Sequence, residues 1–168
     1  MASSISLPFS APQPLAATHR LDEFACREPS LDEWLKRRAL ANQASGASRC
    51  FVVLDSDHRV MGYYALAAGA VNHQTATSNV RRSMPDPVPV MVLGRLAIDQ
   101  RAQGLKLGSA MLKDAVQRAQ MVSAHAGVRA LLVHALSESA REFYLHYGFQ
   151  ESPVQRMTLM MKISKPAD

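Results

Sequence analysis

The feature that most constrains the fold of this chain is a long apolar run that leads through a glycine-bearing turn into a helical pattern. The run VPVMVLGRLAI, residues 88–98, is apolar, and its part VMVLGRLAI, residues 90–98, has the composition of a buried strand. The next residues, DQRAQGLKLGSAMLKDA, place Gly104 and Gly108 at the mouth of a helix. The apolar stripe of this helix consists of Met111, Leu112, Ala115, Val116, Ala119 and Val122. Because a helix N-terminus offers unpaired N–H groups and a partial positive charge, this unit predicts a phosphate-binding turn.

Two common nucleotide-binding motifs do not fit this turn. A P-loop needs Gly-Lys followed by Ser or Thr, whereas Ser109 follows Gly108 directly. The dinucleotide fingerprint GxGxxG, with an acidic residue about 20 positions later, does not fit either. A plain connection between a strand and a helix therefore stays an alternative at this point. The six His and 14 acidic residues show no metal-ligand spacing such as HxxxH, so no metal is expected.

Further strand-like runs surround this unit. CFVVLD and RVMGYYALAAGAV, residues 50–55 and 59–71, are separated by a short polar stretch and predict a hairpin. RALLVHAL, residues 129–136, predicts a buried strand, and MTLMMKI, residues 157–163, predicts a last one. The polar segment 72–89 is punctuated by proline and predicts a long loop.

Capping patterns and glycines mark the expected helix ends. The expected starts are the capping-box pairs Ser30–Glu33 and Ser139–Glu142. The expected ends are Gly46, Gly127 and Gly148. The order strand, turn, helix, strand, helix, strand is typical of a mixed α/β sheet. The length of 168 residues favours one domain, so we expect an extended N-terminal arm over residues 1–18 and a single domain over residues 19–165.

Composition bounds the compartment and the class of partner. Cys26 and Cys50 are the only cysteines, which indicates two free, largely buried thiols in a reducing compartment and hence a cytoplasmic protein. No apolar run approaches the roughly 20 residues that span a bilayer, and the N-terminus lacks the pattern of a secretory signal, so no membrane partner is expected. The formal net charge of +5 and the pI near 9.6 favour a polyanionic partner such as nucleic acid. An ordinary basic surface is the alternative.

The stretch LGRLAIDQRAQGLKLGSAMLKDA, residues 93–115, resembles the acyl-CoA motif of the GNAT superfamily of N-acetyltransferases. The resemblance implies a mostly antiparallel central sheet that is flanked by helices and splayed at the acetyl-CoA site. It also implies that the turn wraps the coenzyme pyrophosphate and that residues 96–98 hold the pantetheine arm and polarise the thioester carbonyl. The implied cofactor-binding residues are Leu96, Ala97, Ile98, Gln103, Gly104, Leu105, Lys106, Leu107, Gly108 and Ser109.

Two residues beside this motif carry separate expectations. Lys106 stands where the family usually has glycine. A side chain is tolerated there if the residue keeps φ below zero, and its ammonium group would then face a phosphate. Arg95 lies next to the implied pantetheine segment and is expected either to face the substrate or to form a structural ion pair.

The stretch ALLVHALSESAREFYLHYGFQ, residues 130–150, resembles the second conserved part of the superfamily. The resemblance implies that Tyr144 protonates the leaving thiolate of the coenzyme and that Phe143 lies in the cofactor site. A phenol suits this task because it stays protonated at neutral pH. Among the other candidates, we expect Tyr147 to pack at the helix end, His146 to be a surface residue and His134 to be a satisfied core histidine.

Several motifs in a fixed order resemble the GNAT toxins of bacterial type II toxin–antitoxin systems. They are FAC, SLDEWL, GYYAL, GRLAID and LLVHA, within a match from about His19 to Ile163. In that family glycine often follows the cysteine, where this chain has Arg27, and we expect the exchange to leave the chemistry unaltered. The resemblance implies acetylation of the α-amino group of the amino acid on charged tRNA, with acetyl-CoA as co-substrate and a block of translation as the result. It also implies a homodimer and a ribbon-helix-helix antitoxin.

Binding of tRNA requires cations that neutralise phosphates. The candidates are Lys36, Arg37, Arg38, Arg81, Arg82, Arg95 and Lys106. Two alternatives stay open. The same chemistry can act on a small amine or a protein N-terminus, although small cationic substrates favour an acidic cleft, which a basic chain is less suited to provide. A non-enzymatic binding module on the same fold is the other alternative, and Tyr144 argues against it.

Overall fold

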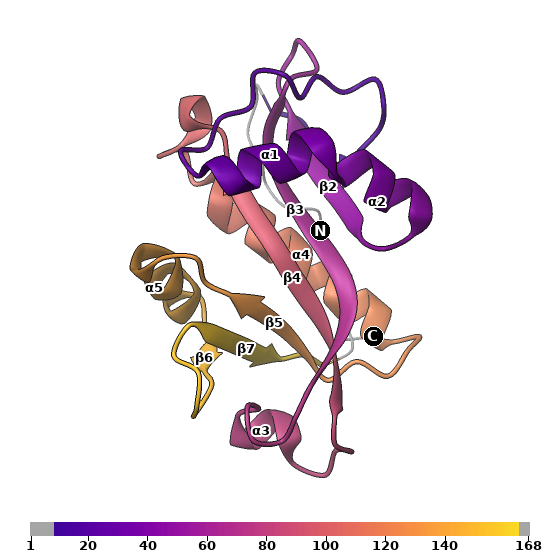
Figure 1. The fold of residues 1–168 in the computed structure, drawn as a ribbon, viewed down its shortest axis with the longest axis vertical. Coiled ribbons are helices and arrows are strands. Elements are labelled where there is room, and N and C mark those ends of the chain that lie inside the picture. The colour runs from indigo at the N-terminus through magenta and orange to yellow at the C-terminus, as the bar shows by residue number, and fades with distance from the viewer. Residues whose placement is uncertain (1–8, 165–168) are drawn as a thin grey trace. The chain divides into compact units, whose positions relative to one another are not determined.

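The computed structural model describes residues 9–164, in which seven strands form one sheet in the order β1-β2-β3-β4-β5-β7-β6 (Figure 1). The strands are β1 (Gln13–Pro14), β2 (Arg49–Leu54), β3 (Val60–Val71), β4 (Val88–Ile98), β5 (Ala130–His134), β6 (Gln150–Glu151) and β7 (Thr158–Lys162). The helices are α1 (Pro29–Arg37), α2 (Ala39–Ser45), α3 (Ser78–Arg81), the 3-10 turn η1 (Gln100–Ala102), α4 (Leu107–Ser123) and α5 (Glu138–His146).

Strand pairing confirms the mixed and mostly antiparallel sheet. The pairs β1–β2, β2–β3, β5–β7 and β6–β7 are antiparallel, whereas β4–β5 is parallel. The pairing of β4 with β5 runs from Val90 to Leu93 on β4. The splay that the resemblance implies at the acetyl-CoA site stays a prediction.

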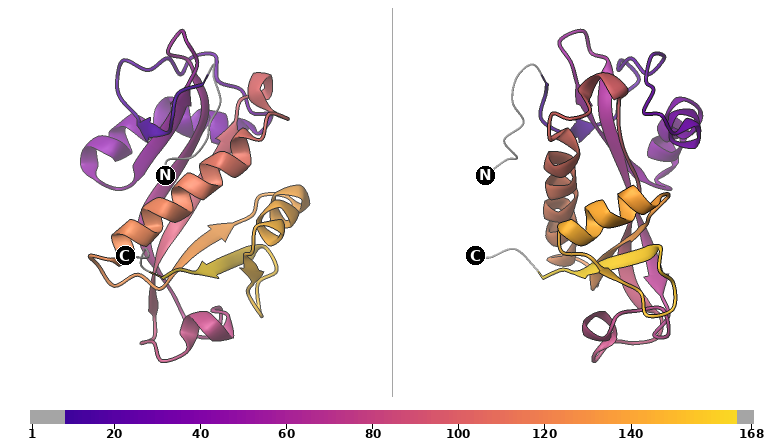
Figure 2. Two further views of the ribbon diagram at one scale, coloured as in Figure 1. Left: turned by 180° about the vertical axis from the view of Figure 1, so that it is seen from behind. Right: turned by 90° about the vertical axis from the view of Figure 1, so that its left-hand side faces the viewer.

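The chain divides into two compact units, and the first consists of Met1–Ala67 and Arg95–Ala115. In this unit the predicted hairpin is confirmed, with Cys50 opposite Ala65 and Val52 opposite Tyr63. Helices α1 and α2 cover one face of β2 and β3, and the start of α4 covers the opposite face (Figure 2). The core on the α1 side includes Leu15, Phe24, Leu35, Ala39, Cys50, Val52, Tyr63 and Ala97. On the α4 side, a Cβ at Gly62 would lie 2.7 Å from the Met111 sulfur, so a larger residue there would require the Met111 side chain to move.

The second unit consists of Ala68–Gly94 and Val116–Asp168. Its core includes Val71, Ala76, Val80, Val88, Val90, Ala130, Leu132 and Met160. The short helix α3 lies inside the segment predicted to be loop. Arg129 fixes it by donating to the carbonyls of Val80 at 3.1 Å and Asn79 at 2.9 Å. A single helical turn has no repeat of apolar residues long enough to be seen in the sequence.

Both predicted capping boxes are wrong in detail. Helix α1 begins at Pro29, and its N-cap Glu28 forms no side-chain capping bond. Proline has no N–H to leave unpaired in the first turn, so the helix begins one residue before Ser30. Helix α5 is capped by Ser137, which is extended and accepts from the Ala140 N–H at 3.1 Å, whereas Ser139 already lies within the helix.

The expected helix ends are confirmed at Gly46 and Gly148, which adopt φ of +81° and +96°. Helix α4, in contrast, ends at Ser123 and not at Gly127. In the expected arm, β1 pairs with β2 and Leu15 is buried, while residues 1–8 lie outside the described residues. The division into an arm and a domain stays a prediction. None of the described helices has the length and apolar character that a membrane span requires.

Candidate active site

The glycine turn between η1 and α4 contains two left-handed residues. Gly104 has φ of +82° and no atom within 4 Å of the position that a Cβ would occupy. Lys106 has φ of +62°, which contradicts the expectation that it keeps φ below zero. The turn itself needs a left-handed residue at this position, and an L-residue pays roughly 1–2 kcal/mol to adopt it. This geometry explains why the superfamily usually places glycine there.

The turn presents its backbone donors at the start of α4. Within the part of the chain that the structure describes, the N–H groups of Leu107, Gly108 and Ser109 have no protein acceptor. The first N–H with a partner is that of Ala110, which donates to the Lys106 carbonyl at 3.2 Å. The Ser109 hydroxyl donates to the same carbonyl at 3.0 Å. Free donors at the N-terminus of a 17-residue helix make this turn a ready site for anionic oxygens.

The side chain of Gln103 points back into the protein. Its amide nitrogen donates to the Ile98 carbonyl at 2.9 Å and to the Cys26 carbonyl at 3.2 Å. Gln103 thereby ties the start of the turn to the backbone of Ile98 and Cys26, and its side-chain NH₂ group is already engaged. Its contribution to an anion site is therefore the shape of the turn.

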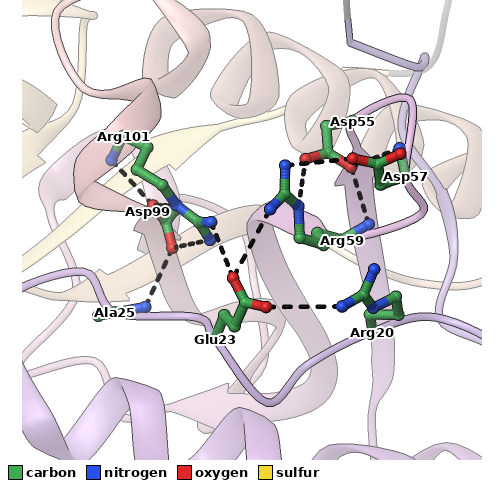
Figure 3. A network of polar contacts seen from close by, with 8 residues as sticks. All are labelled: Arg20, Glu23, Ala25, Asp55, Asp57, Arg59, Asp99 and Arg101. Atoms are coloured by element: carbon green, nitrogen blue, oxygen red, sulfur yellow. Dashed lines mark hydrogen bonds and ion pairs between the residues drawn. The ribbon is translucent and has the colours of Figure 1, made fainter.

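Asp99, at the end of β4 and just before η1, supports the segment that leads into the turn. It was not among the residues predicted from the sequence. It is fully buried and accepts from the Arg101 N–H and Nε at 2.8 Å each and from the Ala25 N–H at 3.1 Å (Figure 3). The Gln100 N–H returns a bond to the Ala25 carbonyl at 2.8 Å. The only signal in the sequence is an acidic residue that follows an apolar strand, with arginine two positions later.

The charge of Asp99 is stabilised by these donors. Burial by itself raises the pKa of this carboxyl group, but the hydrogen bonds from Arg101 and Ala25 outweigh it and hold the pKa below its ordinary value. Arg101 also forms an ion pair with Glu23 at 3.3 Å. Glu23 in turn pairs with Arg59 at 3.6 Å and with Arg20 at 3.5 Å (Figure 3). The network links residues 20–25 to the β2–β3 hairpin and to the end of β4.

The segment Leu96–Ile98 lies directly before this network. Ala97 is buried in the core, while Leu96 and Ile98 are half-buried. Arg95 packs its guanidinium carbon 4.3 Å from the centre of the Trp34 ring. Neither an ion pair nor a hydrogen bond to the described residues engages this guanidinium, so the expected structural ion pair is replaced by a cation–π contact.

In the second unit, Tyr144 is buried on α5. Its ring packs against Phe143 at 5.3 Å and Phe149 at 5.4 Å between centroids. Its hydroxyl has no hydrogen-bond partner among residues 9–164. Burial raises the pKa of this phenol above its ordinary value. The side chain therefore stays protonated throughout the neutral range and can act only as a proton donor there.

A charged cluster fixes α5 within the second unit. The largely buried side chain of Arg141 pairs with Glu138 at 3.1 Å and with Glu151 on β6. Arg156 donates twice to Glu138 at 2.6 Å. These contacts tie the helix that carries Tyr144 to β6 and to the loop before β7.

The remaining cationic candidates fall into two groups. Lys36, Arg37, Arg38 and Arg82 are exposed, and Arg37 pairs with Glu33 at 2.8 Å. Arg81 instead donates to the carbonyls of His73 at 3.2 Å and Ala76 at 3.0 Å, which is a structural use of its charge.

The structure also shows the exposure and contacts of His134, His146 and Tyr147. His146 is exposed, as predicted. His134 is exposed rather than in the core, because it ends β5, and its ring bonds the Thr158 hydroxyl at 3.0 Å. Tyr147 contacts the Phe143 ring at 5.0 Å but is 42% exposed. The described residues contain no group of three or more His, Cys, Asp or Glu that could hold a metal ion.

Comparison with known proteins identifies a family, a close relative and similar structures. The acetyltransferase (GNAT) domain family matches residues 46–151. The chain is 49% identical over 153 residues to the tRNA-acetylating toxin of Mycobacterium tuberculosis (strain ATCC 25618 / H37Rv), covering 91% of this chain and 92% of that protein. AtaT complexed with acetyl-methionyl-tRNAfMet matches with a TM-score of 0.84 at 25% identity, over 92% of this chain and 94% of AtaT. AtaTR bound with AcCoA matches with a TM-score of 0.80 at 25% identity, over 92% and 94% of the two chains.

Proposed function

Because this chain belongs to the GNAT acetyltransferase family, we propose that it transfers an acetyl group from acetyl-CoA to the α-amino group of the amino acid on charged tRNA. The observation that carries the proposal is the 49% identity to a tRNA-acetylating toxin over nearly the whole of both chains. An acetylated α-amino group cannot attack in peptide-bond formation, so the product stops translation and the protein acts as a toxin.

The turn accounts for the coenzyme half of the reaction. Free N–H groups at the start of α4 suit the pyrophosphate, and the open space beside Gly104 lets oxygens approach the backbone. We assign coenzyme contacts to Gly104, Leu105, Lys106, Leu107, Gly108 and Ser109, and to Phe143 beside Tyr144. Gln103 shapes the turn, and the backbone of Leu96, Ala97 and Ile98 receives the pantetheine arm and polarises the thioester carbonyl.

We assign the general acid to Tyr144. As the amine nitrogen forms its bond to the acetyl carbon, the carbon–sulfur bond breaks and the electron pair leaves on sulfur. The phenol O–H donates its proton to that sulfur, the amine releases a proton to solvent, and the phenolate takes a proton back from solvent. Burial raises the pKa of Tyr144, so the phenol carries its proton at neutral pH.

The acceptor is recognised through charge. The exposed cations Lys36, Arg37 and Arg38 at the end of α1, together with Arg82, are suited to tRNA phosphates. Arg81 supports the same surface indirectly, by holding the backbone around α3. Arg95 and Lys106 are further cations at the site.

Three finer assignments complete the proposal. The free thiols Cys26 and Cys50 support action in the cytoplasm. The motifs shared with type II toxins support a ribbon-helix-helix antitoxin as partner and a homodimer as the assembled state.

Label transfer from [acetyl-¹⁴C]acetyl-CoA tests the proposal. Charged tRNA, the same tRNA after deacylation, spermidine and a peptide with a free N-terminus are offered in parallel. We expect label only on the charged tRNA, recovered as an N-acetyl amino acid after hydrolysis of the ester. Label on a free amine or a peptide, with none on charged tRNA, would overturn the assignment of the acceptor.

A further inference from the structure

Side chains from three elements of the first unit pack together around a stack of two aromatic rings. The Trp34 ring of α1 lies 5.9 Å from the Tyr63 ring of β3, with only 11° between their planes. The Arg95 guanidinium of β4 lies 4.3 Å from the centre of the same Trp34 ring. The Tyr63 hydroxyl donates to the Leu31 carbonyl at 2.6 Å, which fixes the base of the stack. Arg95 is therefore held in place by aromatic packing.

The charge of Arg95 has no anionic partner among residues 9–164. The acidic side chains of α1 are engaged elsewhere, since Glu33 pairs with Arg37 and Asp32 accepts from the Cys26 N–H at 2.9 Å. A half-buried guanidinium with unused N–H groups is costly to the free protein and favours an anionic ligand. Its planar fork matches the two oxygens of a phosphodiester.

The position of Arg95 along β4 limits what that ligand can be. Alternation along the strand puts its side chain on the same face as Ala97, which is the face covered by α1. Leu96, the next residue, opens the segment to which we assign the pantetheine arm. The exposed cations Lys36, Arg37 and Arg38 follow Trp34 on the same helix. A nucleic acid that lies along α1 would bring its end to Arg95.

We propose that the Trp34–Arg95 pair is the subsite for the 3′-terminal nucleotide of the aminoacyl-tRNA, with the guanidinium bound to the last phosphodiester. This inference rests on the proposed function. The amino acid is esterified to the ribose of that nucleotide, so a cation that holds its phosphate fixes the α-amino group relative to the neighbouring strand. Trp34 acts as a positioning residue, because its contact with the guanidinium holds that group in place.

The test compares Arg95→Gln, Arg95→Lys and Trp34→Phe with Lys113→Gln, which removes an exposed charge from α4 of the same unit. Steady-state kinetics are measured separately for charged tRNA and for acetyl-CoA, and inhibition is measured with the trinucleotide CCA. For Arg95→Gln we expect KM for charged tRNA to rise about tenfold or more, as for loss of a charge-assisted bond. The KM for acetyl-CoA should stay within about twofold of wild type, and CCA should lose inhibition in parallel.

The conservative variants sharpen the result. Arg95→Lys keeps the charge without the planar fork, so its KM for charged tRNA should lie between wild type and Arg95→Gln. Trp34→Phe should raise the same KM by a smaller factor at an unchanged melting temperature.

Two outcomes would overturn the subsite. The first is that Arg95→Gln has the same KM for charged tRNA as the control Lys113→Gln. The second is that Arg95→Gln raises only the KM for acetyl-CoA, which would indicate that Arg95 binds a coenzyme phosphate. A wild-type enzyme that fails to label charged tRNA would overturn the proposed function itself, so the two failures are distinct.

Discussion

The side-chain amide of Gln103 donates to the main-chain carbonyl of Cys26 at 3.2 Å and so joins the glycine turn to a segment 77 residues earlier. In the same segment, the Ala25 N–H donates to the Asp99 carboxylate, and the Ala25 carbonyl accepts from the Gln100 N–H. The FAC motif near the N-terminus therefore supports the turn to which we assign the coenzyme pyrophosphate. Because the turn is held in this way, its free N–H groups are already in place and need no rearrangement when an anion binds.

Removal of the Gln103 amide should loosen the turn. Gln103→Ala deletes both hydrogen bonds to the Ile98 and Cys26 carbonyls, and we expect the Kd for acetyl-CoA to rise about tenfold. Calorimetric titration measures the change. Gln117→Ala on α4 is the matched control and should bind like wild type. An unchanged Kd for Gln103→Ala would show that the turn holds its shape without this side chain.

Lys106 should tune the turn without being essential. Lys106→Gly relieves a left-handed lysine but gives the unfolded chain more freedom, so the melting temperature should change by only a few degrees. The Kd for acetyl-CoA should change by no more than about tenfold. Lys106→Val, which cannot adopt this φ easily, should be clearly less stable than both. A thousandfold loss of coenzyme binding in Lys106→Gly would contradict our account of the turn.

The exposed cations of α1 should carry much of the salt dependence of tRNA binding. Replacing Lys36, Arg37 and Arg38 together by glutamine removes three candidate phosphate contacts, so the slope of log K against log salt should become shallower by about 2–3. Filter binding over a salt series measures it, with acetyl-CoA affinity as the control. Arg81→Gln should instead lower the melting temperature, because the carbonyls of His73 and Ala76 lose their hydrogen bonds from the guanidinium. An unaltered slope in the triple variant would assign this surface to another partner.

Asp99 should make stability depend on acid pH. Its folded pKa is below the unfolded value of about 3.9, so its contribution is present above that value and is lost as pH falls through the folded pKa. Asp99→Asn should cost about 1–3 kcal/mol at pH 7, and the gap to wild type should narrow below about pH 4. Thermal melts from pH 7 down to pH 2.5 measure this. A gap that stays constant over that range would mean that the charge of Asp99 is not stabilised in the fold.

Much of the fold was predictable because its longer elements leave clear local signals. Apolar runs predicted the hairpin, β4, β5 and β7, a helical repeat of apolar residues predicted α4, and capping residues with a final glycine predicted α5. The strands β1 and β6 have two residues each, which is too short for any period to show. The helix starts were wrong because competing residues, Pro29 and Ser137, stand within two positions of the expected caps.

Candidate site residues could be named from the sequence where they belong to one contiguous motif, and could not where they depend on contacts between distant segments. The turn and Tyr144 belong to contiguous motifs. Asp99 depends partly on the Ala25 N–H, which lies 74 residues earlier in the chain and leaves no local sign in the sequence. Lys106 and Arg27 both adopt positive φ, +62° and +77°, at positions where the resembling families favour glycine. A lysine or an arginine gives no local sign of that conformation, because side-chain-bearing residues rarely adopt it.

The most direct measurement of the central claim is the single-turnover rate of acetyl transfer to charged tRNA by Tyr144→Phe. The change removes one oxygen from a packed ring, so the melting temperature and the Kd for acetyl-CoA should match wild type. Tyr147→Phe, at the end of the same helix and 42% exposed, is the control and should keep the wild-type rate. A positioned acid contributes about 10² to 10⁴-fold, so we predict that Tyr144→Phe loses at least a factor of about 100. A Tyr144→Phe enzyme that transfers acetyl groups at the rate of Tyr147→Phe would contradict the account.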